Sequence, residues 1–197
     1  MEKIILASSS PRRKELLDLL GIPFIVHPSS KEEDFNNDDL PVVVVEKLAL
    51  MKAGDIALHY NEGIVIGADT IVVLDNHILG KPDNEEEAFF MLKRLQGEVH
   101  QVYSGVAIVN AKTKESLVSH RMTKVYMKHL NDEEINWYIK TKEPMDKAGS
   151  YGIQGIGAIF IDKIEGDFFN VVGLPLSLLA DLLKSFEANI IHPKSKV

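Results

Sequence analysis

Short apolar runs alternate with amphipathic stretches along the chain, and this alternation predicts a succession of strands and helices. The pattern predicts strands over residues 3–7, 22–27, 64–66, 70–74, 78–79, 99–109, 117–127, 158–164 and 167–172. It predicts helices over residues 11–20, 42–58, 83 or 84 to 96, and 131–140, and a last helix that starts near residue 175. The acidic stretch 31–39 and the segment 141–157 are expected to be loops, and the tail after residue 188 to be frayed.

Residues with strong local preferences mark several of these boundaries. Asn131 and Glu134 have the spacing of a capping box, and Gly21 stands where a helix end favours a left-handed residue. Asp75-Asn76 is typical of a hairpin turn. Mixed strand and helix order with two long central strands predicts an α/β fold, in which helices flank a mixed, partly antiparallel sheet. No linker stands out, so residues 1–197 are interpreted as one domain.

Composition narrows the class of protein. A chain of 197 residues that is 45% hydrophobic can bury a sizeable core, and no apolar run approaches the length of a membrane span. The apolar start is too short for a signal sequence, and cysteine is absent, so we expect a cytoplasmic protein without disulfides or thiolate metal sites. The net charge of −7 disfavours binding to a nucleic-acid polymer but leaves small phosphate ligands open.

The segment from Ser8 to Arg13 is a candidate anion site. A Ser-rich turn opens the first helix, whose backbone N–H groups and dipole attract an anion, and Arg12 and Arg13 can bind phosphate oxygens in a bidentate manner. Cations in the first turn oppose the helix dipole, so stability alone does not explain them. A solvated basic surface is the alternative interpretation.

Asp69 is a candidate for a catalytic base or a metal ligand. It follows an apolar strand and the small residues Gly67 and Ala68, and we interpret Gly67 as leaving room for a ligand or metal near the backbone. An ordinary turn aspartate is the alternative.

Three further residues are weaker candidates when each is taken alone. Lys81 lies on a tight turn and Lys52 on the preceding helix, and either could serve as a point charge for a phosphate. The glycine-rich segment 142–157 is long for a simple connection, which favours a binding loop, and its Gln154 could pair with the edge of a base.

Other common sites find little support. The histidines form no zinc motif, and neither a dinucleotide fingerprint nor a Walker A motif occurs.

Four ordered motifs over nearly the whole chain resemble the Maf family of septum-formation-inhibitor-like nucleotide pyrophosphatases. They are Leu6-Ala7-Ser8-Ser9-Ser10-Pro11-Arg12-Arg13-Lys14-Glu15-Leu16-Leu17, Gly67-Ala68-Asp69-Thr70, Gly80-Lys81-Pro82, and the run from Glu143 to Gly155. The resemblance implies a Maf/ITPase-like fold with two lobes around a central cleft. It also implies a hydrolase of the nucleotide diphosphatase class that acts on dTTP and UTP.

The resemblance also implies roles for particular residues. Asp69 would be the proton acceptor, and Glu33 would join it at a metal site for Mg²⁺ or Mn²⁺. Implied substrate-specificity residues are Arg12, Thr70 and Gln154, and the phosphate-binding residues would be Ser8, Arg13, Lys52 and Lys81.

The physical interpretation and the resemblance agree on one hypothesis. Water attacks the α-phosphorus of a nucleoside triphosphate, cations stabilise the departing pyrophosphate, and Gln154 pairs with the O4/N3 edge of uracil or thymine. Modified pyrimidine nucleotides could be substrates of such a house-cleaning enzyme. Two alternatives stay open: a nucleotide-binding regulator of cell division without turnover, and an enzyme for methylated purine nucleotides. The oligomeric state stays open too, with a homodimer as one alternative.

Overall fold

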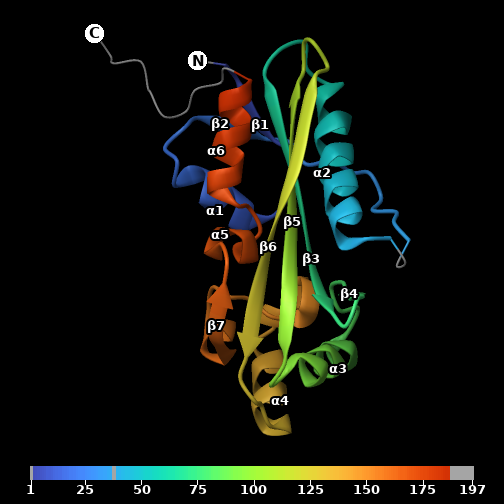
Figure 1. Cartoon of the computed structure of the whole chain (residues 1–197), viewed down its shortest axis with the longest axis vertical. Helices are drawn as coiled ribbons and strands as arrows, with labels where there is room; N and C mark the ends of the chain where they lie inside the picture. The colour runs from blue at the N-terminus through green and yellow to red at the C-terminus, as the bar shows by residue number, and fades with distance from the viewer. Residues whose placement is uncertain (1, 37–38, 187–197) are drawn as a thin grey trace. The chain divides into compact units, whose positions relative to one another are not determined.

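The computed structural model describes residues 2–36 and 39–186, and it shows a mixed α/β fold (Figure 1). The strands are β1 (Ile4–Leu6), β2 (Phe24–Val26), β3 (Ile64–Leu74), β4 (His77–Leu79), β5 (Val99–Asn110), β6 (Ser116–Met127) and β7 (Ile161–Glu165). The α-helices are α1 (Pro11–Asp18), α2 (Pro41–Ala57), α3 (Glu85–Leu95), α4 (Asp132–Lys140), α5 (Phe168–Val172) and α6 (Leu176–Ser185). Short 3₁₀ helices are η1 (Glu143–Asp146), η2 (Ala148–Ser150) and η3 (Ile156–Phe160). The expected frayed tail lies outside the described residues.

The sheet is mixed, as the sequence predicts. Within the described residues its order is β2-β1-β3-β5-β6-β7, with β4 paired to β3. Strand β1 is parallel to both β2 and β3, whereas β4 runs antiparallel to β3 and β7 antiparallel to β6.

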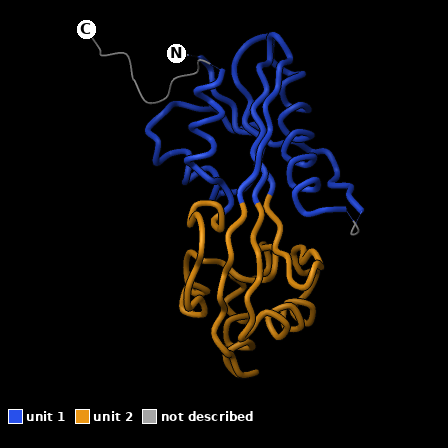
Figure 2. Tube along the Cα trace, in the orientation of Figure 1, with its two compact units in different colours: residues 1–69, 104–121, 173–197 blue, residues 70–103, 122–172 orange. Residues whose placement is uncertain are grey.

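The chain divides into two compact units, which are coloured separately in Figure 2. Unit 1 comprises residues 1–69, 104–121 and 173–197, and unit 2 comprises residues 70–103 and 122–172. Three boundaries fall inside β3, β5 and β6, and the fourth directly follows α5. The cleft implied by the family resemblance stays a prediction.

In unit 1, α2 lies on one side of the strands, and α1 and α6 lie on the other (Figure 1). The predicted apolar face of α2 is confirmed, since Val45, Leu48, Ala49 and Ile56 are all buried. Small side chains such as Ala49 and Ala53 pack against β1, β3 and β5, which allows α2 to approach the sheet closely.

In unit 2, α3 and α4 pack with the 3₁₀ helices around a core that includes Leu92, Tyr138 and Phe160. The predicted capping box is confirmed, because the Asn131 side chain accepts from the Glu134 N–H while the Glu134 carboxylate accepts from the Asn131 N–H. The hairpin turn is confirmed as well, with φ of 50° at Asp75 and 63° at Asn76.

Three predictions of secondary structure are wrong. Residues 158–160, expected to begin a strand, belong to η3, and β7 starts only at Ile161. Residues 64–74 form one continuous strand without the break expected at Gly67-Ala68-Asp69, because these small residues are buried in extended conformation. Residues 168–172 are helical instead of extended. The Asp167 carboxylate accepts from the N–H groups of Phe169 and Asn170, which is how an aspartate starts a helix.

Candidate active site

The placement of Asp69 depends on the close approach of α2 to β3. A Cβ atom added at Gly67 would lie 2.7 Å from the backbone nitrogen of Ala53 and closer still to the carbonyl oxygen of Ala49. Only glycine therefore fits where the two backbones meet. The interpretation of Gly67 as leaving room for a ligand is wrong, because helix α2 fills that space. The glycine instead sets the distance between β3 and the helix that carries Lys52.

Lys52 joins two carboxylates. Its Nζ donates to Oδ1 of Asp69 and to Oε1 of Glu33, both at 2.6 Å. The side chains of Lys52 and Asp69 are 12% and 8% exposed, whereas that of Glu33 is 50% exposed. The Lys52–Asp69 pair is thus shielded from water, and Glu33 reaches it from the loop before α2.

Burial raises the pKa of the Asp69 carboxyl, while the charges of Lys52 and Arg13 act in the opposite direction. Burial disfavours the charged form of a carboxyl, and neighbouring cations favour it. A carboxylate with a raised pKa is a stronger base than one in water, which suits a proton acceptor that works near neutral pH.

A backbone carbonyl and a side-chain hydroxyl help to anchor Arg13. Its Nε donates to the carbonyl oxygen of Gly173 at 2.9 Å, and its Nη1 donates to Oγ of Ser8 at 3.3 Å. Burial lowers the pKa of Arg13, whereas the charges of Asp69 and Glu33 raise it. Arg13 therefore lies within electrostatic reach of both carboxylates, and one of them, Asp69, stands in the middle of β3.

Ser8 is buried and organises the turn before α1. Its Oγ also accepts from the backbone N–H of Ser10 at 3.2 Å. Ser10 occupies the N-cap position, but its side chain makes no capping hydrogen bond, so Ser8 rather than Ser10 orders this turn. Arg12 is half-buried in the first turn of α1, and its charge lowers the pKa of Arg13.

Unit 1 thus brings together most of the candidate residues, namely Ser8, Arg12, Arg13, Glu33, Lys52 and Asp69. The remaining three, Thr70, Lys81 and Gln154, belong to unit 2. Thr70 follows Asp69 in β3 and is half-buried. The exposed Lys81 lies on the turn after β4, and that turn is tied to η2 by a hydrogen bond from the Gly149 N–H to the Gly80 carbonyl at 3.0 Å.

Sequence reasoning missed three features of these sites. The Gly173 carbonyl holds Arg13 although the two residues are 160 positions apart, and a carbonyl group leaves no signal in a sequence. In unit 2, Tyr138 and Glu143 bind the segment that carries Gln154. Glu143 stands in one of the recognised motifs, but its contacts depend on the folded chain.

Glu33 and Asp69 are two carboxylates with the ligand type that a hard divalent cation takes. Among residues 2–36 and 39–186, no three or more histidine or acidic side chains form a ready metal-binding group. The two carboxylates nevertheless converge on one cation, the Lys52 ammonium. Mg²⁺ in nucleotide-binding sites commonly uses one or two carboxylates together with substrate phosphates, so this pair of hard oxygen ligands fits such an ion.

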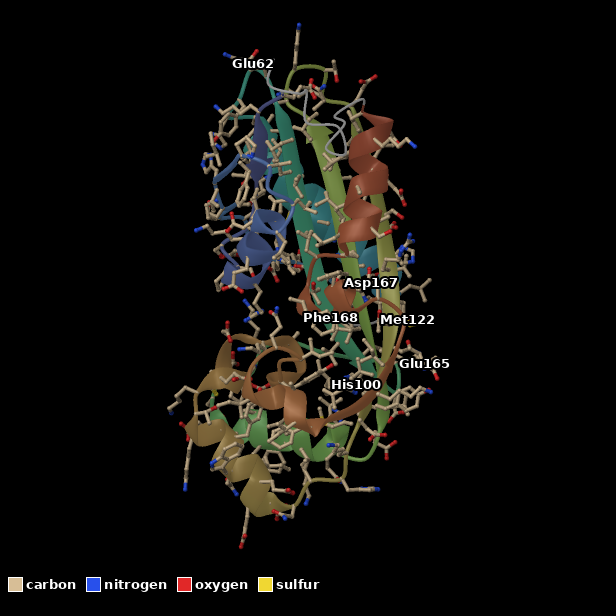
Figure 3. The ribbon with its side chains drawn as sticks, turned by 90° about the vertical axis from the view of Figure 1, so that its left-hand side faces the viewer. Glu62, His100, Met122, Glu165, Asp167 and Phe168 are labelled. Carbon is tan, nitrogen blue, oxygen red and sulfur yellow. The ribbon has the colours of Figure 1, made fainter. Side chains whose placement is uncertain are left out.

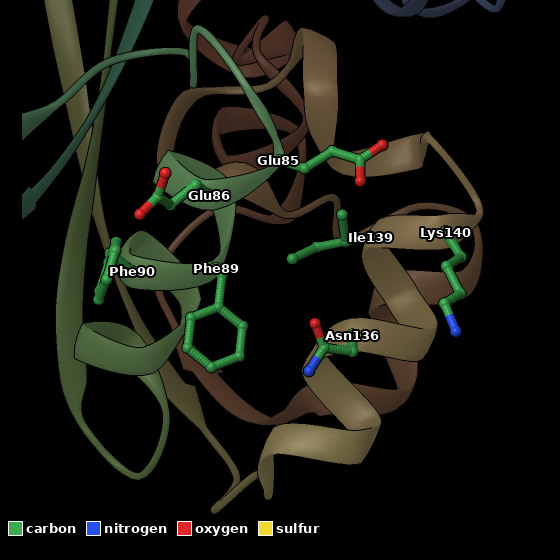
Figure 4. Close-up of a pocket in the computed structure, with 7 residues that line it drawn as sticks. All are labelled: Glu85, Glu86, Phe89, Phe90, Asn136, Ile139 and Lys140. Atoms are coloured by element: carbon green, nitrogen blue, oxygen red, sulfur yellow. The ribbon is translucent and has the colours of Figure 1, made fainter.

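A separate pocket of about 360 Å³ lies between α3 and α4 in unit 2 (Figure 4). Phe89 and Ile139 point into it, and Glu85 and Lys140 lie near its rim. None of the candidate site residues lines this pocket.

No helix in the described part of the chain combines the length and the apolar character that crossing a bilayer requires.

The structure thus defines an α/β protein in which Arg12, Arg13 and the Lys52–carboxylate cluster belong to one compact unit. The sequence model described as Maf-like protein matches residues 3–186, and the chain belongs to this family. Among its relatives, a dTTP/UTP pyrophosphatase of Alkaliphilus oremlandii is 51% identical over 193 residues, which cover 97% of this chain and 100% of the relative. A dTTP/UTP pyrophosphatase of Bacillus cereus (strain ZK / E33L) is 52% identical over 192 residues, with 98% and 100% covered.

Among solved structures, a nucleoside-triphosphatase / dITP/XTP pyrophosphatase of Mycobacterium abscessus has a TM-score of 0.47 and is 15% identical, with 94% of this chain and 97% of that chain covered. A likeness this distant bears on neither the substrate nor the site.

Proposed function

We propose that this chain is a pyrophosphatase that hydrolyses dTTP and UTP to the nucleoside monophosphate and pyrophosphate. The observation that carries the proposal is its identity of about one half, over essentially the full length of both chains, with relatives that bear this name. We further propose that the enzyme is a nucleotide diphosphatase, which is a hydrolase that acts on acid anhydrides.

The proposed reaction breaks the bond between the α-phosphorus and the oxygen that bridges to the β-phosphate. The oxygen of a water molecule forms the new bond to phosphorus. Asp69 accepts a proton from that water, a role for which a buried carboxylate with a raised pKa is suited. The leaving group is pyrophosphate, whose negative charge grows as the bond breaks.

Cationic side chains in unit 1 are suited to stabilise that charge. Arg13 and Lys52 are held in place by hydrogen bonds before any substrate binds, so they need little reorganisation during the reaction. Arg12 and the N–H groups at the start of α1 offer further donors for phosphate oxygens. Lys81 contributes a point charge in the same scheme.

A divalent cation belongs to the proposal. Glu33 and Asp69 would hold Mg²⁺ or Mn²⁺ together with phosphate oxygens, and the bound ion would supply charge neutralisation on the triphosphate. Removal of divalent ions with EDTA is then expected to abolish turnover, and added Mg²⁺ or Mn²⁺ to restore it. Unchanged turnover in EDTA would contradict this part of the proposal.

For the base, Gln154 pairs with the O4/N3 edge of uracil or thymine, and Arg12 and Thr70 add to the selectivity. An amide both donates and accepts, which matches the acceptor O4 and the donor N3–H of these bases. Modified pyrimidine triphosphates that keep this edge are then substrates as well, which is the proposed house-cleaning role.

The test is a panel of canonical and modified nucleoside triphosphates, scored by pyrophosphate release from the wild-type protein and from Asp69→Asn. We expect release from dTTP and UTP, and a loss of about 10²-fold or more in the variant. Asp55→Asn is the matched control, because Asp55 is another carboxylate of unit 1, half-buried, that pairs with Ser29 and Lys31. Full activity of Asp69→Asn would remove Asp69 from the mechanism, and no release from any pyrimidine nucleotide would reject the function.

A cytoplasmic location is a prediction that rests on the sequence, whereas the sequence leaves the oligomeric state open, with a homodimer as one alternative. Cell fractionation tests the first, and light scattering of the purified protein tests the second.

A further inference from the structure

Segment 152–157, which carries Gln154, is bound at both ends by two side chains of unit 2. Tyr138, on α4, accepts a hydrogen bond at its Oη from the Gly152 N–H at 3.2 Å and donates to Oε1 of Glu143 at 2.9 Å. Glu143, at the start of η1, accepts from the Ile156 N–H and the Gly157 N–H, both at 2.9 Å. Gln154 lies between these anchored ends.

The environment of this pair keeps Tyr138 neutral and Glu143 ionised. Burial and the neighbouring Glu143 carboxylate raise the pKa of Tyr138, so its hydroxyl stays a donor at all ordinary pH values. Partial burial alone would raise the pKa of Glu143, but the N–H groups of Gly157 and Ile156 and the Tyr138 hydroxyl outweigh it and hold that pKa below its usual value. The Glu143 carboxylate is therefore ionised, and charge-assisted hydrogen bonds are the stronger kind.

The backbone of the segment is shaped to fit these two side chains. Gly155 has φ of 82°, and a Cβ atom there would lie 2.7 Å from Oε2 of Glu143. A Cβ atom at Gly157 would lie 2.5 Å from Oη of Tyr138. Glycine is favoured at 155 by the positive φ, and at 157 because a Cβ atom would also lie 2.5 Å from the Gly152 carbonyl oxygen.

A glutamine selects between bases only when its side-chain amide is held in one orientation. Uracil and thymine present an acceptor at O4 and a donor at N3, whereas cytosine presents a donor at N4 and an acceptor at N3. An amide can turn to suit either pattern, so Gln154 discriminates only if its position favours one orientation. A glycine-rich segment alone does not supply that rigidity.

We propose that Tyr138 and Glu143 are positioning residues for base selection, which hold Gln154 where it accepts uracil or thymine and rejects cytosine. This inference rests on the proposed function. Neither residue touches the base, and both act through the backbone of segment 152–157.

The experiment measures kcat and KM for UTP and for CTP in the wild-type protein, Tyr138→Phe and Glu143→Gln. Tyr138→Phe keeps the ring that packs against Phe160, and Glu143→Gln places an amide donor where a carboxylate oxygen met an N–H group. We expect the ratio of kcat/KM for UTP to that for CTP to fall about 10- to 100-fold in each variant, mainly through a higher KM for UTP.

Glu134→Gln is the matched control, because Glu134 also accepts from a backbone N–H in unit 2, at the start of α4, but has no contact with segment 152–157. We expect its ratio to stay at the wild-type value. In a Gln154→Ala background, Tyr138→Phe is expected to change the ratio less than about twofold, because the two residues act on the same property. A merely structural role of Tyr138 would lower activity towards both nucleotides by the same factor.

The outcomes separate this inference from the proposed function. A wild-type protein that hydrolyses neither UTP nor dTTP rejects both. A wild-type protein that prefers UTP to CTP, with the preference intact in Tyr138→Phe and Glu143→Gln, overturns the inference and leaves the function standing. An intact preference in Gln154→Ala also overturns it, because segment 152–157 would then not contact the base.

Discussion

Replacement of Lys52 by methionine tests the electrostatic organisation of the unit 1 site. The substitution keeps most of the side-chain volume but removes the ammonium that pairs with Asp69 and Glu33. It leaves a buried carboxylate with Arg13 as a compensating cation nearby.

The expected cost follows from burial. Removal of one partner from a buried ion pair costs about 3–5 kcal/mol, because the other charge stays behind without compensation. Arg13 offsets part of this, which favours the lower end, about 3 kcal/mol of the free energy of unfolding. The contact with Glu33 is half exposed and adds less than about 1 kcal/mol, because water screens it.

The loss of unfolding free energy in Lys52→Met increases with pH. The folded pKa of Asp69 is raised above its unfolded value of 3.8, so ionised Asp69 disfavours the fold. Without Lys52 the pKa rises further. The penalty of Lys52→Met is therefore small where Asp69 is protonated in both states, and it grows as the pH rises through the folded pKa.

Urea unfolding of the wild type, Lys52→Met, Asp69→Asn and the double variant measures these terms, in EDTA so that no divalent ion replaces the ammonium. We expect a loss of about 3 kcal/mol near pH 8 and a clearly smaller loss near pH 4. In the Asp69→Asn background the loss is expected to shrink to about 1 kcal/mol. Equal losses with and without the Asp69 charge would refute the ion pair as the reason.

Three further predictions concern stability. Burial lowers the pKa of His100, which lies on β5 (Figure 3), from 6.5 to about 4, so His100 disfavours the fold as the pH falls between these values. His100→Gln can keep the hydrogen bond to Tyr151. In urea unfolding it should recover about 2 kcal/mol near pH 5 and nothing near pH 8. Gly67→Ala in β3 should cost about 2–3 kcal/mol and lower kcat. Its control is Gly54→Ala in α2, where the added Cβ meets open space, and it should stabilise by about 0.5–1 kcal/mol. Equal thermal unfolding of the two variants would contradict the close packing of α2 on β3. Asn131→Ala should cost about 1 kcal/mol in thermal unfolding because it removes the capping box, and an unchanged midpoint would speak against that cap.

Local signals predicted much of the secondary structure. The helix starting at Pro11, the capping box at Asn131 and the turn at Asp75-Asn76 each depend on neighbours within a few residues, and all three are confirmed. The helix at 168–172 was missed although its capping residue, Asp167, stands directly before it. The apolar Phe-Phe-x-Val-Val pattern suggested a strand and outweighed that signal.

Contacts between distant residues explain what the sequence could not predict. The role of Gly67 depends on the approach of Ala49 and Ala53, and a glycine that meets a helix looks the same in a sequence as one that meets a ligand. The same holds for Gly173, whose backbone carbonyl binds Arg13. Asp69 and Lys52 were candidates from the residue pattern, whereas Glu33 was named only through the family resemblance. The contacts among the three were not predicted, because their spacing carries no motif.

The central claim is that this chain cleaves pyrimidine nucleoside triphosphates at the α-phosphorus. Incubation of the purified protein with UTP and Mg²⁺ in ¹⁸O-labelled water, followed by mass spectrometry of the products, tests it most directly. We expect UMP and pyrophosphate, with the label in UMP alone. Label in pyrophosphate, release of orthophosphate and UDP, or tight binding of UTP without turnover would contradict the claim.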